Sequence, residues 1–252
     1  MQSQGIRYNI HGSEMQFVEV TLDPKERAVA EAAAMMYMDG GIKMQTKIGD
    51  ASKQNSGIFG KFMGAGKRAL TGENVFMTFF TNTTESQKTV AFSAPTPGKV
   101  LAFELDKLGG TILCQRESFL CAYGDVAINV YIQKSLTTAM FGGSGFVMQK
   151  LQGNGIAFVN TGGTVIQREL APNEVLAVDT GSLVALQPSV KFQVKFVSGV
   201  RNSLFSGEGF YLTYLTGPGH VWMQSLPFDR LKLKLTADIY RTMGKKPPKA
   251  RK

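Results

Sequence analysis

The sequence predicts an all-β protein built from three tandem copies of one β-sandwich unit. Two motifs recur three times in the same order, most of the remaining segments alternate apolar and polar residues, and glycine or proline punctuates the chain at short intervals. Short alternating strands between such turn residues are typical of sandwiches and barrels. Recurrence at a fixed order indicates a repeated structural unit.

The first motif is a glycine-anchored strand opening. It reads ALTGENVFM at residues 69–77, MFGGSGFVM at 140–148 and LFSGEGFYL at 204–212. Each copy has two apolar residues, a small residue, a glycine, two variable positions and an apolar strand start. The anchoring glycines are 71 and then 64 residues apart.

The second motif is a strand that ends in a turn. It reads VEVTLDP at residues 18–24, AFELD at 102–106 and QRELAP at 167–172. An apolar stretch follows each copy, at residues 27–38, 111–123 and 175–186. Together the two motifs place repeats at about residues 6–98, 99–163 and 164–235 of one compact β domain spanning residues 1–235, with pseudo-threefold symmetry.

Alternation places strands at residues 16–22, 126–132, 190–197 and 231–235. The alanine-rich segment 28–36 is the hardest to assign, because helix propensity alone would make it a helix. The corresponding segment of the third copy, 175–179, is rich in β-forming residues. We therefore predict strand for residues 28–36, since tertiary context overrides propensity.

Apolar residues in glycine-rich loops form the candidate oligomer or partner surface. At equivalent positions of three repeats such loops would gather on one rim, where an apolar patch marks an interface; folding of the loops over the sandwich ends is the alternative. The residues concerned are Ile58, Phe59, Phe62, Met63, Phe141, Phe146, Phe205 and Phe210.

The net charge of +9 is concentrated at one end of the chain. Residues 230–252 contain nine basic residues and one acid, whereas residues 1–229 contain 19 basic and 18 acidic residues. We expect residues 236–252 to form a basic tail that is at least partly disordered. The candidate anion contacts in this tail are Lys245, Lys246, Lys249, Arg251 and Lys252.

Several segments resemble a known family. They are VEVTLDP (18–24), AEAAAMMYMD (30–39), APTPG (94–98) and GEGFYLTYLTGPG (207–219). Together they are similar to a bacterial family of unknown function related to the mitochondrial-biogenesis (altered inheritance of mitochondria) proteins, over about residues 6–235. The chain departs from the family at Lys25, where the family favours glycine. The resemblance implies a fold like that of the tryptophan RNA-binding attenuation protein subunit, and it implies no catalytic residues.

No catalytic, metal or cofactor site is expected from the residues present. Residues 60–67 resemble a phosphate-binding loop, but their glycine spacing is wrong and Arg68 stands where a Ser or Thr is needed. His11 and His220 are the only histidines and lack a metal-binding partner spacing. Cys114 and Cys121 lie in apolar alternation, where cysteine is usually a small buried hydrophobe.

Paired carboxylates give no better candidate for catalysis. Glu73 and Glu208 occupy equivalent repeat positions, where the middle copy has Ser144. Positions related by the repeat would lie far apart, so turn chemistry is the better interpretation.

The sequence therefore favours a non-enzymatic binding or scaffolding protein that assembles into homo-oligomers and needs no cofactor. The alternative is a nucleic-acid-binding protein that uses the basic tail and sheet edges. A protein partner or an anionic membrane surface is a further possibility, and no small-molecule substrate is identified. We expect a cytoplasmic location, since the N-terminus lacks a signal peptide and no apolar run is long enough for a membrane helix.

Overall fold

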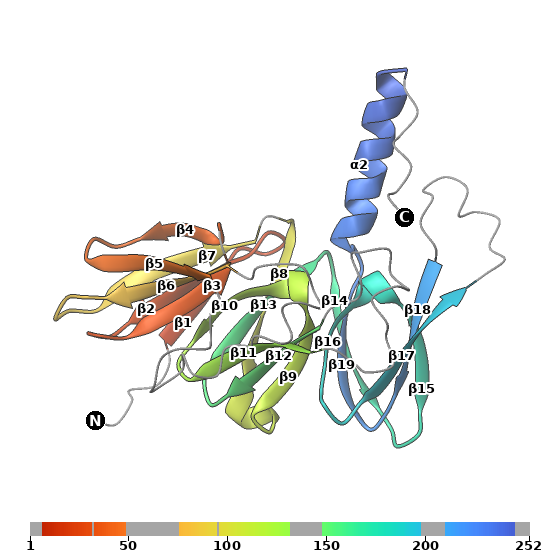
Figure 1. Cartoon of the computed structure of the whole chain (residues 1–252), viewed down its shortest axis with the longest axis horizontal. Helices are drawn as coiled ribbons and strands as arrows, with labels where there is room; N and C mark the ends of the chain where they lie inside the picture. Colours follow the sequence, from red (N-terminus) through yellow and green to blue (C-terminus); the bar gives the residue numbers. More distant parts are fainter. Residues whose placement is uncertain are drawn as a thin grey trace. The chain divides into compact units, whose positions relative to one another are not determined.

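The computed structural model describes residues 7–31, 33–48, 76–94, 96–131, 148–197 and 210–244. In this part of the chain all regular structure is β-strand except one α-helix and short 3-10 turns (Figure 1). The all-β class expected from the sequence is therefore confirmed. The chain divides into two compact units: unit 1 contains Met1–Ile132 and Val147–Thr161, and unit 2 contains Gln133–Phe146 and Gly162–Lys252. The repeat boundaries expected from the sequence remain predictions.

Unit 1 is made of strands in three groups. In chain order they are β1 (Arg7–His11), β2 (Phe17–Leu22), β3 (Arg27–Glu31), β4 (Met35–Met38), β5 (Ile42–Ile48), β6 (Phe76–Asn82), β7 (Lys88–Ser93), β8 (Gly98–Glu104), β9 (Thr111–Gln115), β10 (Phe119–Tyr123), β11 (Val126–Tyr131), β12 (Met148–Gly153) and β13 (Ile156–Gly162). The hydrogen-bonded orders are β1-β2-β7-β4, β5-β6-β3-β10-β13-β8 and β11-β12-β9. The antiparallel pairs are β1–β2, β2–β7, β4–β7, β3–β6, β5–β6, β3–β10, β10–β13, β11–β12 and β9–β12.

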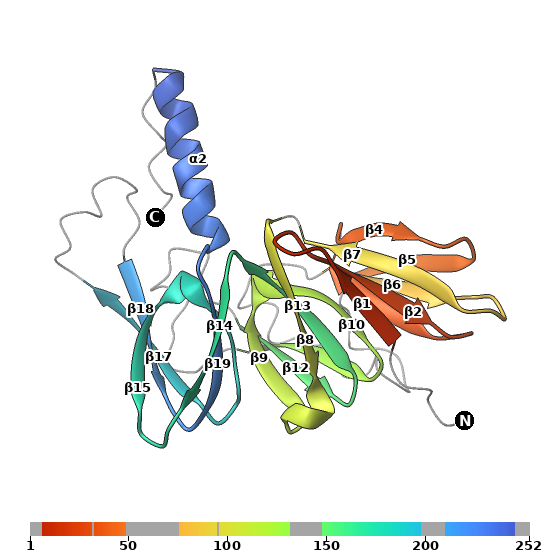
Figure 2. The same ribbon diagram turned by 180° about the vertical axis from the view of Figure 1, so that it is seen from behind.

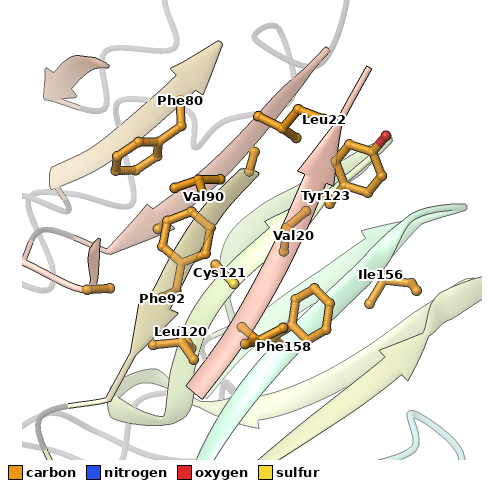
Figure 3. Packing of buried hydrophobic residues seen from close by; sticks show 14 of the residues in the cluster. Val20, Leu22, Phe80, Val90, Phe92, Leu120, Cys121, Tyr123, Ile156 and Phe158 are labelled. Atoms are coloured by element: carbon orange, nitrogen blue, oxygen red, sulfur yellow. The ribbon is translucent and has the colours of Figure 1, made fainter. Parts of the chain in front are cut away.

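The first two sheets of unit 1 bury one shared apolar cluster. Strands β2 and β7 contribute Val20 and Phe92 from one sheet, and β6, β10 and β13 contribute Phe80, Cys121 and Phe158 from the other (Figure 3). The Phe80 and Phe92 rings meet edge to face, with centroids 5.1 Å apart. Alternate residues of β2 point into this cluster, as the alternation in residues 16–22 predicted. Burial of such side chains supplies most of the stabilisation of a sandwich, at about 1.5–3 kcal/mol each.

Unit 2 contains strands β14 (Val165–Leu170), β15 (Val175–Asp179), β16 (Leu183–Leu186), β17 (Lys191–Val197), β18 (Phe210–Thr216) and β19 (Gly219–Gln224), followed by helix α2 (Phe228–Thr242). The antiparallel orders are β14-β19-β16 and β15-β18-β17. Both groups contribute fully buried side chains, including Leu170, Leu183 and Val221 from the first and Leu215 from the second. Figure 2 shows the strands of this unit from behind, with α2 projecting away from them.

The described part of the alanine-rich segment 28–36 is strand at residues 28–31 and 35–36, as predicted, with a turn at residues 33–34 that the prediction did not include. It forms β3 and the start of β4, and Ala28, Val29 and Ala30 are buried between neighbouring strands. A strand is hydrogen-bonded to β3 on each side, so β3 is an inner strand of its sheet. Tertiary pairing has thus overridden helix propensity.

The strand predicted at residues 231–235 is wrong, because these residues lie inside α2. The Leu-Lys alternation covers only five residues. Leu231, Leu235 and Ile239 also recur at helical spacing, so the two periods are ambiguous over so short a segment. No neighbouring strand is hydrogen-bonded to this segment in the described part of the chain, and the helical period prevails.

The turn at Asp23–Glu26, in which the chain departs from the family that its sequence resembles, is a tight one. Glu26 N–H donates to the Asp23 carbonyl oxygen, and Asp23 N–H donates to Glu26 Oε2 at 2.8 Å. Lys25 has a φ of 69°, in the left-handed region that favours glycine. The family's glycine at this position therefore matches the backbone, and Lys25 adopts the same conformation at some energetic cost.

Candidate functional site

The surface residues predicted from the sequence lie almost entirely outside the described residues. This applies to Ile58, Phe59, Phe62, Met63, Phe141, Phe146 and Phe205, and to Lys245, Lys246, Lys249, Arg251 and Lys252. The phosphate-loop-like segment 60–67 and the positions Glu73, Ser144 and Glu208 also lie outside them. Phe210 is the first residue of β18 and pairs with Val197. The loop-rim interface therefore stays a prediction.

Strand β4 forms an exposed apolar sheet edge in unit 1. It pairs with β7 on one side and ends its sheet on the other, as far as the described strands extend. Met36 is 53% exposed and Tyr37 is 41% exposed. The pKa of the Tyr37 phenol is raised, mainly by partial desolvation and to a smaller extent by a hydrogen bond to Glu19. The strand has no charged residue and no proline, two of the usual means of protecting an edge, but it is only four residues long and has a register shift after Met35.

Strand β15 forms a comparable edge in unit 2. Its only partner among the described strands is β18, and Val175 is 60% exposed. The one charged residue, Asp179, stands at the end of the strand and lies 3.4 Å from Arg230. The middle of the strand therefore presents backbone N–H and C=O groups beside apolar side chains. Such an edge is a template for pairing with another strand.

An internal pairing in unit 1 shows what this kind of edge does when it has a partner. Strands β3 and β10 are antiparallel, with Ala30 opposite Cys121, Val29 opposite Ala122 and Ala28 opposite Tyr123. All of these side chains are at most 7% exposed. Pairing thus converts two strand edges into continuous buried sheet.

The titratable groups of unit 1 include one carboxyl with a strongly perturbed pKa. Burial raises the pKa of Glu31 from 4.5 to about 7, with Arg116 opposing this shift and Glu117 adding to it. Burial also raises the pKa of the Cys114 thiol far above its usual range, and the Glu31 charge adds to this. A neutral, buried thiol is a poor nucleophile. Both Cys114 and Cys121 are fully buried, as the sequence predicted.

The two histidines lie in ordinary structural surroundings. The His11 ring stacks on Phe17, with centroids 4.8 Å apart, and its Nε2 lies 2.9 Å from Glu19. His220 is in β19, and its backbone N–H donates to the Gln187 side chain. Within the described ranges no group of three His, Cys, Asp or Glu side chains is placed to hold a metal ion.

The sequence prediction missed the two sheet edges because it looked for interfaces in loops. The signal lies in the repeats that the sequence predicts. In a tandem array the outer strands of the first and last copies lack the neighbour that the inner strands have. Met36, Tyr37 and Val175 belong to those outer strands.

Comparison with known proteins identifies the family. A family model described as mitochondrial biogenesis AIM24 matches residues 8–226. A crystal structure of a Streptococcus pyogenes protein is similar in fold, with a TM-score of 0.69 and 21% sequence identity, covering 94% of this chain and all of that one. Among curated proteins, none matches the chain.

Proposed function

Because the chain belongs to the AIM24 family of mitochondrial-biogenesis proteins, we propose that it is a non-enzymatic scaffolding protein that assembles into homo-oligomers. The proposed assembly joins the β15 edge of one copy to the β4 edge of the next. The observation that carries this proposal is the internal β3–β10 pairing. In the proposed repeats β3 corresponds to β15, and β10 corresponds to β4.

The repeat on which this depends is supported by the strand orders. The proposed repeats share six strands each, β2–β7, β8–β13 and β14–β19, with β1 as an extra strand before the first set. The orders β2-β7-β4, β8-β13-β10 and β14-β19-β16 place the first, last and third strand of each set side by side. The orders β3-β6-β5, β9-β12-β11 and β15-β18-β17 place the second, fifth and fourth strand side by side. The same strand order in all three sets favours three tandem β-sandwich repeats.

Local details support the same correspondence. Strands β4, β10 and β16 each carry a register shift after their first residue, at Met35, Phe119 and Leu183. The turn at Asp23 also recurs at Ala171, where Glu174 bonds back to the turn and Asn173 has a φ of 65°.

Buried polar residues occupy one repeated position. They are Thr78 in β6, Gln149 in β12 and Thr213 in β18, each at most 4% exposed. Each stands opposite the fourth residue of the neighbouring strand, at Ala30, Cys114 and Val178. These positions support a residue-by-residue correspondence between the proposed repeats.

This correspondence gives a register for the proposed contact. In the internal pair, Cys121 faces Ala30 and Ala122 faces Val29. The matching positions are Tyr37 opposite Val178 and Met38 opposite Ala177. A contact of this kind is head-to-tail, so repetition closes a ring or extends a filament.

The test is the solution mass of the full chain, compared with two edge variants. Tyr37→Lys and Ala177→Lys each place a charge in the proposed contact, and lysine on an edge strand blocks pairing. The control is Met44→Lys, which replaces a 44% exposed methionine on β5, an edge outside the proposal.

We expect an oligomer for the native chain and for Met44→Lys, and monomers for both edge variants. A monomeric native chain would overturn the proposal. So would an oligomer that survives both edge lysines, because assembly would then use another surface. Nucleic acid retained by the native chain and released by salt would favour the nucleic-acid-binding alternative.

A further inference from the structure

Helix α2 presents an apolar face that the described residues leave exposed. Phe228 is 47%, Leu235 54% and Ile239 57% exposed, and Met243, directly after the helix, is 58% exposed. Leu231, which is partly buried, belongs to the same face. At 3.6 residues per turn, these five positions lie within an arc of about 120° around the helix axis. A stripe of this width is what a surface helix normally packs against a core.

The helix is attached to unit 2 at its beginning and projects beyond that point (Figures 1 and 2). Arg230, in the first turn of the helix, lies 3.4 Å from Asp179 at the end of β15. The large exposed residues Leu235 and Ile239 lie further along, beyond this contact.

Basic residues lie on the side opposite the apolar stripe. Arg230, Lys234 and Arg241 fall within a narrow arc of the helix and are exposed. Lys232 falls inside the apolar arc and is also exposed, and a lysine there can extend its ammonium group past the apolar side chains to the polar boundary. The sequence from residue 230 to 252 adds up to nine basic residues against one acid.

We propose that α2 is a docking helix for anionic phospholipid surfaces. Its apolar stripe enters the boundary between headgroups and acyl chains, while the basic residues contact the negative headgroups. A basic polar face opposite an apolar face with large aliphatic and aromatic residues is the composition of an interfacial helix. Charge complementarity and the exposed stripe therefore point to the same occupant.

The helix lies on the membrane and does not cross it. Its 15 residues span about 22 Å, whereas a crossing helix needs about 20 apolar residues. In the described ranges, no helix combines the length and apolar character of a membrane span.

Two other occupants fit the surface less well. A coiled coil with a second copy would continue the seam of Phe228, Leu231 and Leu235 through Asp238 and Thr242, which are polar. A nucleic acid would engage the basic side and leave the apolar stripe in water. Only an amphipathic surface uses both sides of the helix.

The experiment is sedimentation of the full chain with vesicles of phosphatidylcholine, with and without an equal proportion of phosphatidylglycerol. We compare the native chain with Leu235→Asp/Ile239→Asp and with the control Met15→Asp/Ile166→Asp. The control removes two exposed apolar residues outside the helix. Met15, in a bend of unit 1, is 71% exposed, and Ile166, on β14 of unit 2, is 58% exposed. Thermal unfolding of each variant verifies that it is folded.

We expect the native chain and the control to bind the anionic vesicles. The affinity of the helix variant should be lower by at least about tenfold. Binding to pure phosphatidylcholine is expected to be weak, and salt lowers the affinity for anionic vesicles. Absence of binding by the native chain overturns the proposal. Equal binding by the helix variant also overturns it, because the basic tail alone would then account for the affinity.

A second measurement detects insertion directly. Leu235→Trp adds a fluorophore on the apolar stripe, while the native Trp222 is 6% exposed within β19. Addition of anionic vesicles should shift the emission of Leu235→Trp to shorter wavelength and leave that of the native chain unchanged. An unshifted emission with bound protein contradicts insertion and identifies a purely electrostatic contact.

Discussion

Strands β10 and β4 occupy the same position in two proposed repeats, yet their surroundings are opposite. Every residue of β10 is buried between β3 and β13, whereas Met36 and Tyr37 of β4 are exposed on an edge. Both strands are apolar and both have a register shift after their first residue. The comparison shows that β4 has the apolar composition of a buried strand. It differs from β10 in having a neighbouring strand on one side only among the described residues.

The largest expected difference in the free energy of unfolding comes from placing a lysine at the same repeat position of β10 and of β4. Cys121→Lys places an ammonium group at a fully buried site, which should cost at least about 3 kcal/mol of the free energy of unfolding. Tyr37→Lys at the exposed site should change it by less than about 1 kcal/mol in the monomer. Chemical denaturation of both variants checks this difference, and equal losses would show that β4 is not a free edge.

The next effect concerns Glu31, at the end of the internally paired strand β3. Burial raises the pKa of Glu31 from 4.5 in the unfolded chain to about 7 in the folded protein, so folding takes up a proton between these pH values. The free energy of unfolding should therefore fall by roughly 3 kcal/mol as the pH rises from 4.5 to 7, and remain low above pH 7. Glu31→Gln should remove this slope and stabilise the protein at pH 8. An unchanged slope in a pH series of unfolding curves would contradict burial of the carboxyl.

The smallest effects compare the buried polar residues at one repeat position. Thr213 Oγ1 is hydrogen-bonded to Thr180 Oγ1 at 2.9 Å, whereas Gln149 Oε1 has no hydrogen-bond partner among the described residues. Thr213→Val should therefore lower the free energy of unfolding by about 1 kcal/mol, and Gln149→Met should raise it by about the same amount. Thermal melting of both variants measures these shifts, and a destabilised Gln149→Met would mean that the amide has a partner.

The sequence predicted the all-β class and the strands at residues 28–31 and 35–36, because motif recurrence outweighed the helix propensity of the alanines. It missed helix α2 because five alternating residues fit a strand period, although Leu231, Leu235 and Ile239 also fit a helix. Which edges lack a neighbour depends on non-local pairing, so Tyr37 and Val175 could not be selected from local patterns alone. The apolar loop residues, such as Phe59 and Phe141, remain predictions.

Disulfide capture between two variants of this protein tests the central claim, assembly of β15 with β4 of another copy, most directly. One chain carries Met38→Cys and the other Ala177→Cys, the two positions placed opposite each other by the β3–β10 register. Directly paired residues of antiparallel strands have Cβ atoms about 4.5–5.5 Å apart, close to the roughly 4 Å of a disulfide. Mild oxidation of the mixture should give a dimer that contains one chain of each kind, and neither variant alone should give one. No mixed dimer, or a bond that forms only within a single chain carrying both cysteines, would contradict assembly through these edges.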